Sequence, residues 1–365
     1  MTCIHGLRAP LLGLRLRPSR QDGGLIVAIV ISGLCALGYL ASLMPRLGGS
    51  VADLVLSIAV GLAPLPVLLV VVLAIDQLTP KPRLNLVFAF AWGGGIALLA
   101  AAVLTKASGG GTATTPLFEE MAKGAALLWL LWWRRHAITS LTVGIVYAAM
   151  AGLGFATVEN VTLYLTAFAR GGHGDVLTMV VHHGLGMGIA HPLCASLAGL
   201  GIAYAVIARG GTRFPIALAS CAGAVLLHIL WNDTVFSASH LPAGQKQAYV
   251  VCAAVVLVLT AVIVLEHRLL VATIGRHLLL YRATGLVTPD DIAMLSSGRA
   301  RWQTLHQART PSARRAMADY QRAATELVIL HQRAERDNVP PNDHDRDERL
   351  AVMTQARARL RAAAL

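Results

Sequence analysis

The stretch Phe118-Glu119-Glu120-Met121-Ala122-Lys123 carries two adjacent carboxylates and a lysine, and it opens directly into the apolar run 124–133. Together the two segments are long enough to belong to a membrane helix. Each ionised side chain at the centre of such a helix would oppose insertion by roughly 2.5–3.5 kcal/mol, so three facing lipid would cost up to about 10 kcal/mol. We therefore expect these side chains to lie near an interface, to pair with each other, or to face a polar interior.

The composition places most of the chain in a membrane. Its 365 residues are 56% hydrophobic and 14% charged, whereas about 25% of the residues of a soluble domain are charged. The net charge of +12 comes from an N-terminal arm, certain loops and a C-terminal tail, a distribution typical of membrane proteins with one positive side. We therefore predict no nucleic-acid binding. The five cysteines contain no CxxC pair, which argues against a thiolate zinc site.

Apolar stretches long enough to cross a bilayer, at about 20 residues each, recur along the chain. Eight are found, at 24–44, 53–75, 86–105, 117–133, 138–168, 189–208, 214–232 and 248–267. If the N-terminus is cytoplasmic, every inner segment holds more Arg and Lys than any outer loop, as the positive-inside rule requires. We therefore predict an all-α fold, a polytopic transmembrane helix bundle of about eight spans with both termini in the cytoplasm. The apolar but His-containing stretch 174–192 is predicted to be a re-entrant or interfacial helix.

Three regions follow from this pattern. They are a basic cytoplasmic arm at 1–23, a transmembrane domain at 24–270 and a cytoplasmic helical tail at 271–365. In the tail, Thr-Pro-Asp-Asp at 288–291 and Thr-Pro at 310–311 predict helix starts, because Thr caps a helix and Pro suits its first turn. The tail contains no catalytic motif that we recognise. It is either a solvated appendage or a docking module for an unknown cytoplasmic partner.

Polar side chains interrupt three further spans. They are Glu159 and Asn160 in the fifth span, His191 at the start of the sixth, and His228 and Asn232 in the seventh. Phe155 lies four residues before Glu159, so the two share a helix face. The predicted topology brings Glu159, His191 and His228 to the depth of the Glu119-Glu120 pair, near the outer face. Any one of them could simply reach the interface, but ionisable residues grouped inside a membrane indicate function. Lys123 is spaced to pair with either glutamate.

Glycines in the third and fifth spans have a structural interpretation. The run 93–95 and the pair Gly152 and Gly154 are typical of positions where membrane helices pack closely.

Carboxylates beside imidazoles can activate water, directly or through a metal. An Asn one turn after a His can orient that His or donate to an oxyanion. The chain has no Gly-x-Ser-x-Gly elbow, no HExxH motif and no pair of membrane aspartates. The polar set therefore favours amide hydrolysis through glutamate, with or without a metal.

Four blocks in this order resemble the PrsW family of intramembrane proteases, relatives of the type II CAAX prenyl endopeptidases. They are Glu119-Glu120-Met121-Ala122-Lys123, Phe155-Ala156-Thr157-Val158-Glu159-Asn160, His191-Pro192 with Gly199, and His228-Ile229-Leu230-Trp231-Asn232. The resemblance covers about residues 80–240. It departs from the family where an Arg often precedes the helix-opening His, since this chain has His182 and His183 there. His183 is the candidate replacement.

The resemblance implies an intramembrane endopeptidase in the bacterial plasma membrane. Its substrate would be a single-pass membrane protein, such as an anti-sigma factor, cut near the outer face. Glu119 or Glu120 would be the water-activating base. Glu159, His191 and His228 would be metal ligands, or acid and oxyanion partners. The residues that would support them are Asn232, Lys123, Asn160 and His183. No cofactor is certain from the sequence, because the set permits both a zinc site and a metal-free mechanism.

Two other functions fit the same residues. One is a non-catalytic scaffold of this fold that binds transmembrane helices, although both glutamates and both motif histidines are retained. The other is a transporter lined by Glu and His, which predicts polar residues at several depths and an internal repeat. The confinement of the set to one depth favours the protease.

Overall fold

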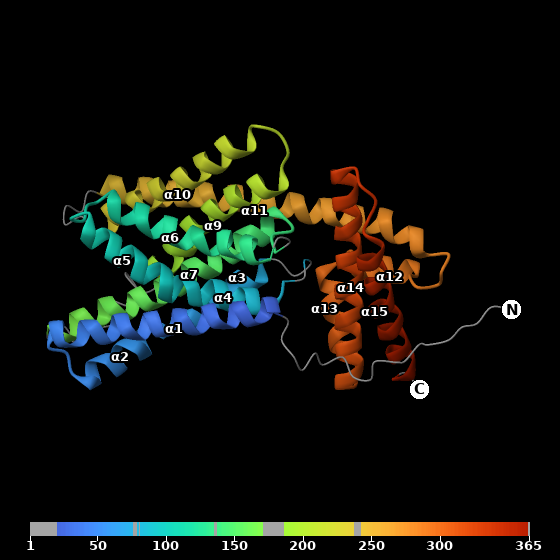
Figure 1. Cartoon of the computed structure of the whole chain (residues 1–365), viewed down its shortest axis with the longest axis horizontal. Coiled ribbons are helices and arrows are strands. Elements are labelled where there is room, and N and C mark those ends of the chain that lie inside the picture. Colours follow the sequence, from blue (N-terminus) through green and yellow to red (C-terminus); the bar gives the residue numbers. More distant parts are fainter. Residues whose placement is uncertain are drawn as a thin grey trace.

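The computed structural model describes residues 20–75, 79, 81–134, 137–170, 186–236 and 242–363, and every regular element in them is helical. The membrane part contains α1 (Arg20–Leu47), α2 (Val51–Leu62), α3 (Leu65–Ala74), α4 (Arg83–Trp92), η1 (Gly93–Ala97), α5 (Leu98–Ala107), α6 (Thr114–Trp133), α7 (Leu141–Ala169), α9 (Gly186–Ile207), α10 (Arg213–Phe236) and α11 (Pro242–Leu278). The tail contains η3 (Leu279–Tyr281), α12 (Pro289–Leu295), α13 (Gly298–Gln307), α14 (Pro311–Asp337) and α15 (Asp343–Ala362). Figure 1 shows the first group as a bundle, with the tail helices across one end of it.

The bundle is that of an integral membrane protein. Among the described residues, seven helical segments are long and apolar enough to span a bilayer: Asp22–Leu47, Val51–Ala74, Arg83–Ala107, Leu141–Ala169, Gly188–Ile207, Arg213–Asp233 and Gln247–Tyr281. The remaining predicted span is α6. It is less apolar because it carries Glu119, Glu120 and Lys123, but all three side chains are buried in the bundle. The polytopic helical bundle predicted from the sequence is confirmed.

The central helix is α7. Apart from Glu159 and Asn160, its residues are mostly apolar or small on all sides. Such a helix is expected at the centre of a bundle rather than at its surface. It packs against α9 along much of its length and also contacts α2, α4, η1 and α6. Most of its residues are buried. Consequently any side chain on α7 can be brought against several neighbouring helices.

Glycines allow these neighbours to approach the backbone of α7. A Cβ atom added to Gly93, in the π-helical turn η1, would lie 1.8 Å from the carbonyl oxygen of Ala151. One added to Gly154 would lie 1.9 Å from the carbonyl oxygen of Phe90. These distances leave no room for a side chain, so the glycines predicted to be close-packing positions are confirmed as such.

Gly152→Ala tests how this packing positions the candidate site. The new Cβ would lie 2.5 Å from the carbonyl oxygen of His191 and 2.8 Å from Cα of Pro192, so α9 must shift. We expect a destabilisation of about 1–3 kcal/mol and reduced activity, because overpacking moves the backbone that carries His191. Thermal unfolding in detergent measures the first effect. Gly275→Ala on α11 is the matched control: no atom lies within 4 Å of its added Cβ. An unchanged melting temperature for Gly152→Ala would contradict the packing argument.

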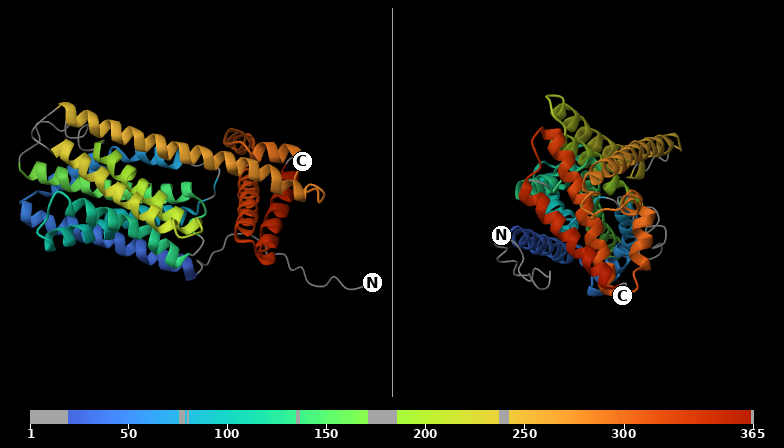
Figure 2. Two further views of the ribbon diagram at one scale, coloured as in Figure 1. Left: turned by 90° about the horizontal axis from the view of Figure 1, so that it is seen from above. Right: turned by 90° about the vertical axis from the view of Figure 1, so that its right-hand side faces the viewer.

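The long helix α11 links the bundle to the tail (Figure 2). Its Glu266 accepts hydrogen bonds from the backbone N–H groups of Leu141 and Thr142, at 2.8 and 2.7 Å. Ser140 accepts from the N–H of Val143, at 3.1 Å. The first three free donors of α7 are thereby satisfied, which the N-terminus of a helix requires. Sequence analysis did not identify Glu266, because its partners lie more than 120 residues away.

The tail forms a second core with the end of α11. Leu270, Ile274 and Leu278 of α11 are buried against residues of the tail helices such as Leu327 and Met353. The predicted helix starts are confirmed: Thr288 and Thr310 each cap a helix whose first turn contains Pro. One helix, α11, runs across the predicted boundary at 270, and the division into three regions stays a prediction.

Candidate active site

Four helices bring the ionisable side chains together at one depth of the bundle. At about 1.5 Å per residue, Glu119 and His191 lie about 8 Å inside the first residues of α6 and α9. His228 and Glu159 lie about 12 and 15 Å before the last residues of α10 and α7. Glu119, Glu120, His191 and His228 are buried, and the Glu159 side chain is 21% exposed. The structure thus assembles the five residues that the predicted topology placed at similar depth.

One carboxylate oxygen of Glu120 contacts two polar side chains. Its Oε1 accepts a hydrogen bond from Nζ of Lys123 at 2.6 Å and lies 2.9 Å from Nδ1 of His228. A carboxylate can only accept, so Nδ1 of His228 carries the proton and its Nε2 presents a lone pair. Glu120 therefore sets the tautomer and the orientation of His228, as carboxylates do for catalytic and metal-binding imidazoles. The predicted pairing of Lys123 is confirmed, with Glu120 as its partner.

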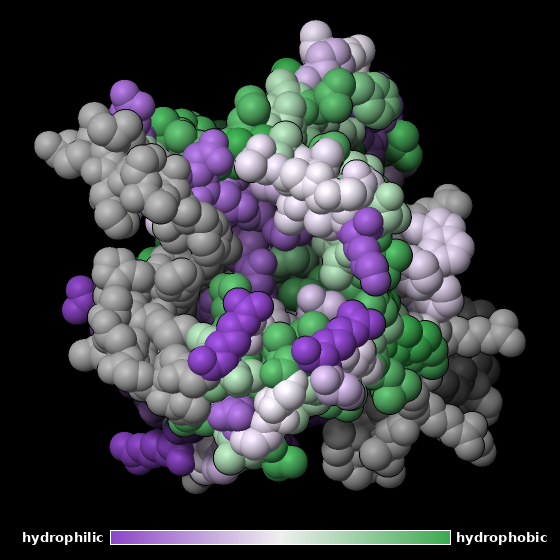
Figure 3. All heavy atoms as spheres, turned by 90° about the vertical axis from the view of Figure 1, so that its left-hand side faces the viewer, coloured by the Kyte–Doolittle hydropathy of each residue, from purple (hydrophilic) through white to green (hydrophobic). Residues whose placement is uncertain are grey.

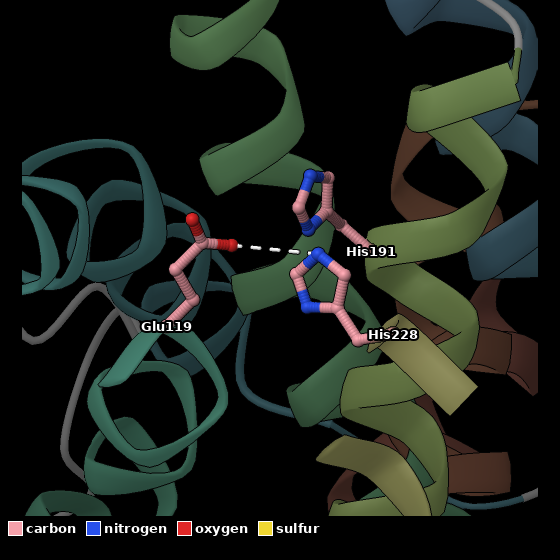
Figure 4. Close-up of side chains that lie close together, drawn as sticks. All are labelled: Glu119, His191 and His228. Atoms are coloured by element: carbon pink, nitrogen blue, oxygen red, sulfur yellow. Dashed lines mark ion pairs between the residues drawn. The ribbon is translucent and has the colours of Figure 1, made fainter. Parts of the chain in front are cut away.

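Glu119 faces the other nitrogen of the same ring. Its Oε2 lies 3.5 Å from Nε2 of His228, and Figure 4 shows the two groups pointing toward each other. Both atoms are buried, and neither has a hydrogen-bond partner among the described residues. Two acceptors facing each other in a buried site are stabilised by a proton donor or a cation between them. A water molecule, a proton or a metal ion would meet this requirement.

His191 is held by two partners. Nζ of Lys123 lies 3.0 Å from its Nδ1, and an ammonium group can only donate, so Nδ1 accepts. Its Nε2 then carries the proton and donates to Oε2 of Glu159 at 2.5 Å. The ring of Phe155 packs beside His191, with 5.1 Å between centroids, and also lies 4.6 Å from Nζ of Lys123. Phe155 is therefore a platform for both residues, where the sequence indicated only a helix face shared with Glu159.

Three residues predicted to support the site are Asn232, Asn160 and His183. Asn232 lies one turn beyond His228, and its Oδ1 is buried without a hydrogen-bond partner among the described residues. Asn160 is buried on α7 next to Glu159. His183 and most of the stretch predicted to be re-entrant lie outside the described residues.

Residues 81–261, which contain this whole cluster, match the model of the PrsW family intramembrane metalloproteases. Over these residues the chain belongs to the PrsW family. No curated protein and no solved structure matches the chain. The family is one of intramembrane proteases, so the chain is a membrane-embedded protease that acts on a substrate in the bilayer.

A metalloprotease needs metal ligands, and the site of this PrsW protein contains a suitable group. Glu119, His191 and His228 each offer one ligand atom, and these atoms lie within 4.8 Å of one another. One carboxylate and two imidazoles are a donor set of catalytic zinc. The set has Glu119 where the sequence suggested Glu159. Oε2 of Glu119 and Nε2 of His228 have no hydrogen bond among the described residues, whereas both ring nitrogens of His191 are engaged, by Lys123 and by Glu159, so His191 would have to give up one of these contacts. The donor chemistry fits a metal ion.

The site of this PrsW protein lies toward the end of the bundle away from the tail. Figure 3 looks onto that end and shows hydrophilic residues inside a recess, with residues near the middle of the hydropathy scale along one side of it. Water meets a membrane protein at the ends of its helix bundle, so it can enter such a polar recess. Water has to reach an intramembrane hydrolase, so this end is the appropriate side for a hydrolytic site.

Proposed function

We propose that this PrsW-family protein is an endopeptidase that hydrolyses a peptide bond of a single-pass membrane protein, near the outer face of the bacterial plasma membrane. An anti-sigma factor is a substrate of the right kind. The observation that carries the proposal is the buried pair of free acceptors, Oε2 of Glu119 and Nε2 of His228, 3.5 Å apart. Such a pair can bind the attacking water and take its proton.

The roles of the two adjacent glutamates follow from their contacts. Each glutamate has one buried oxygen without a hydrogen-bond partner among the described residues, and that of Glu119 lies 3.5 Å from Nε2 of His228, which supports Glu119 as the water-activating carboxylate. Glu120 is bound to Lys123 and to Nδ1 of His228, which supports a positioning role. Lys123 balances the charge of Glu120. This assignment refines the sequence-based hypothesis, which left both glutamates open as the base.

His191 is suited to donate a proton, whereas Glu119 is suited to accept one. Because its Nε2 carries a proton shared with Glu159, it can donate to the carbonyl oxygen or to the leaving amine of the substrate. Asn232, with a buried amide one turn from His228, would orient the substrate or support the same oxygen. Glu159 would then accept the hydrogen bond that keeps His191 in this tautomer.

A metal-dependent version of the same site would use zinc, with Glu119, His191 and His228 as its ligands. In that version zinc would replace Glu119 in activating water, and His191 would be a ligand instead of a proton donor. When bound, zinc makes a coordinated water more acidic and polarises the substrate carbonyl. Glu120 would then fix the His228 ring for ligation through its bond to Nδ1.

We propose that both termini are cytoplasmic. Arg83 and Arg134 lie at the bundle end that meets the Arg-rich tail, and this end holds the beginning of α4 and the end of α6. At the opposite end, the described connections after α1, α5 and α7 each hold or adjoin one basic residue, Arg46, Lys106 and Arg170. By the positive-inside rule this distribution supports a cytoplasmic tail and a site toward the outer face.

Cleavage of membrane reporters tests the activity. Wild type and His228→Ala would each be co-expressed with a panel of single-pass proteins tagged at both ends. We expect wild type to release fragments whose ends, mapped by mass spectrometry, fall in the outer part of the reporter span. His228→Ala should release none, because it removes one of the two acceptors. Equal cleavage by both proteins would disprove the proposed site.

Removal of metal tests the zinc version separately. We expect exhaustive chelation of the purified protein in detergent to lower cleavage to background, and added zinc to restore it, because zinc supplies the activated water. The metal content per chain is measured in parallel. Full activity of a metal-depleted sample would reject zinc while leaving the glutamate-dependent protease in place.

A further inference from the structure

A cavity of about 650 Å³ lies where the tail meets the bundle, far from the proposed active site. Trp132 and Arg134 line it from the end of α6, Ile329 and Arg333 from α14, and Arg349 from α15. Figures 1 and 2 show the tail helices lying across this end of the bundle. The volume is within the range of small-molecule sites, about 300–1,000 Å³.

The tryptophans at the end of α6 place the cavity at the membrane surface. Trp129, Trp132 and Trp133 pack against one another, with 5.2 Å between the ring centroids of Trp129 and Trp132. Trp132 is 68% exposed and is followed at once by the end of the helix. Tryptophan is enriched at the level of lipid headgroups. The cavity therefore opens at the headgroup level of the leaflet on the tail side.

Two of the arginines in the lining are neutralised by carboxylates. Arg349 pairs with Glu348 at 2.7 Å, with Glu326 at 3.6 Å and with Asp345 at 3.9 Å, and the last two carboxylates also line the cavity. Arg134 pairs with Asp22 and donates to Asn85 at 2.9 Å.

Arg333 is the uncommitted arginine of the lining. It lines the cavity half-buried, and within the described chain it makes no ion pair or hydrogen bond. The cavity thus holds a guanidinium group that is not used by the protein itself, next to the apolar side chains of Trp132 and Ile329.

We propose that this cavity binds the phosphate ester of an anionic phospholipid, with Arg333 as the donor. Guanidinium groups match the geometry of phosphate oxygens better than any other side chain. Basic pockets at the cytoplasmic side of helix bundles are where anionic headgroups bind. Trp132 and Ile329 would contact the glycerol and the start of the acyl chains. A lipid bound there would connect the end of α6 to α14 and so hold the tail against the membrane domain.

Lipid binding to the full-length protein tests the proposal. Native mass spectrometry of detergent-purified wild type would follow titration with phosphatidylglycerol, phosphatidylcholine and soluble glycerol 3-phosphate. We expect phosphatidylglycerol to bind more tightly than phosphatidylcholine, and Arg333→Gln to weaken it about fivefold or more. Arg315→Gln is the matched control, because it removes the same charge from an exposed position of α14 outside the cavity.

The outcomes distinguish the sources of the phosphate. Glycerol 3-phosphate that competes as strongly as phosphatidylglycerol would support the site and identify a soluble phosphate ester as its ligand. Equal binding of phosphatidylglycerol to wild type, Arg333→Gln and Arg315→Gln would overturn the proposal, as would equal binding of the two lipids to wild type. Circular dichroism and elution volume show whether Arg333→Gln is folded, and this substitution breaks no ion pair or hydrogen bond within the described chain.

Discussion

Glu119→Gln is expected to lower the rate of reporter cleavage by about 10²-fold or more while making the protein more stable. The amide cannot take a proton from water and is a poor metal ligand, and loss of a general base costs about 10²–10⁴-fold. At the same time its NH₂ group can donate to Nε2 of His228, which now faces an acceptor at 3.5 Å. A new buried hydrogen bond contributes about 1 kcal/mol, or about 2–4 °C in the melting temperature of a protein domain of 150–250 residues.

Opposite effects on activity and stability separate a catalytic from a structural role. Initial cleavage rates and thermal unfolding would be measured on the same detergent preparation. Asp290→Asn at an exposed position of the tail is the control and should change neither. Substantial residual cleavage by Glu119→Gln, with loss of cleavage in Glu120→Gln alone, would exchange the roles that we give to the two glutamates. A lower melting temperature for Glu119→Gln would show that its carboxylate is already paired in the resting protein.

Lys123→Met is expected to be among the most destabilising single substitutions in the chain, at about 3–5 kcal/mol. The Lys123 side chain is fully buried, and its Nζ lies 2.6 Å from Oε1 of Glu120. Removing the lysine leaves the Glu120 carboxylate buried without its counter-charge, and it also removes the donor to Nδ1 of His191. The free energy of unfolding in a denaturing detergent titration measures the loss.

The double substitution Lys123→Met with Glu120→Gln is the decisive comparison. We expect it to be more stable than Lys123→Met alone, because no unpaired charge remains and the amide oxygen introduced by Glu120→Gln can still accept from Nδ1 of His228. If the double variant were the less stable of the two, Glu120 would not depend on Lys123 for its charge. In that case the contacts of Glu120 with His228 alone would have to account for its burial.

Several features of this protein could be predicted from local properties of the sequence. Hydropathy over about 20 residues identifies a membrane span wherever the chain is continuously apolar. The constant rise of a helix then fixes the depth of each polar residue along its span, which is why Glu159, His191 and His228 could be placed at the level of Glu119. Capping at Thr288 and Thr310 is likewise decided within four residues.

Other features depend on contacts between distant segments. Glu266 reaches the start of α7 across more than 120 residues, and no local pattern encodes that contact. The cavity beside Arg333 exists only because α14 lies against the end of α6. The sequence identifies α6 as an apolar stretch, but its three charged side chains are acceptable in a membrane only because other helices surround them.

The glutamate pair shows most clearly which features are local to the sequence and which depend on contacts between distant segments. Its sequence determines that two carboxylates and a lysine enter the membrane together, and that a polar interior must receive them. It leaves open which carboxylate the lysine binds, since both spacings allow a pair. Adjacent residues point about 100° apart on a helix, so each glutamate meets different neighbours. Only the positions of α9 and α10 decide that Glu120 is bound by Lys123 and His228, while Glu119 keeps a free oxygen toward His228 Nε2.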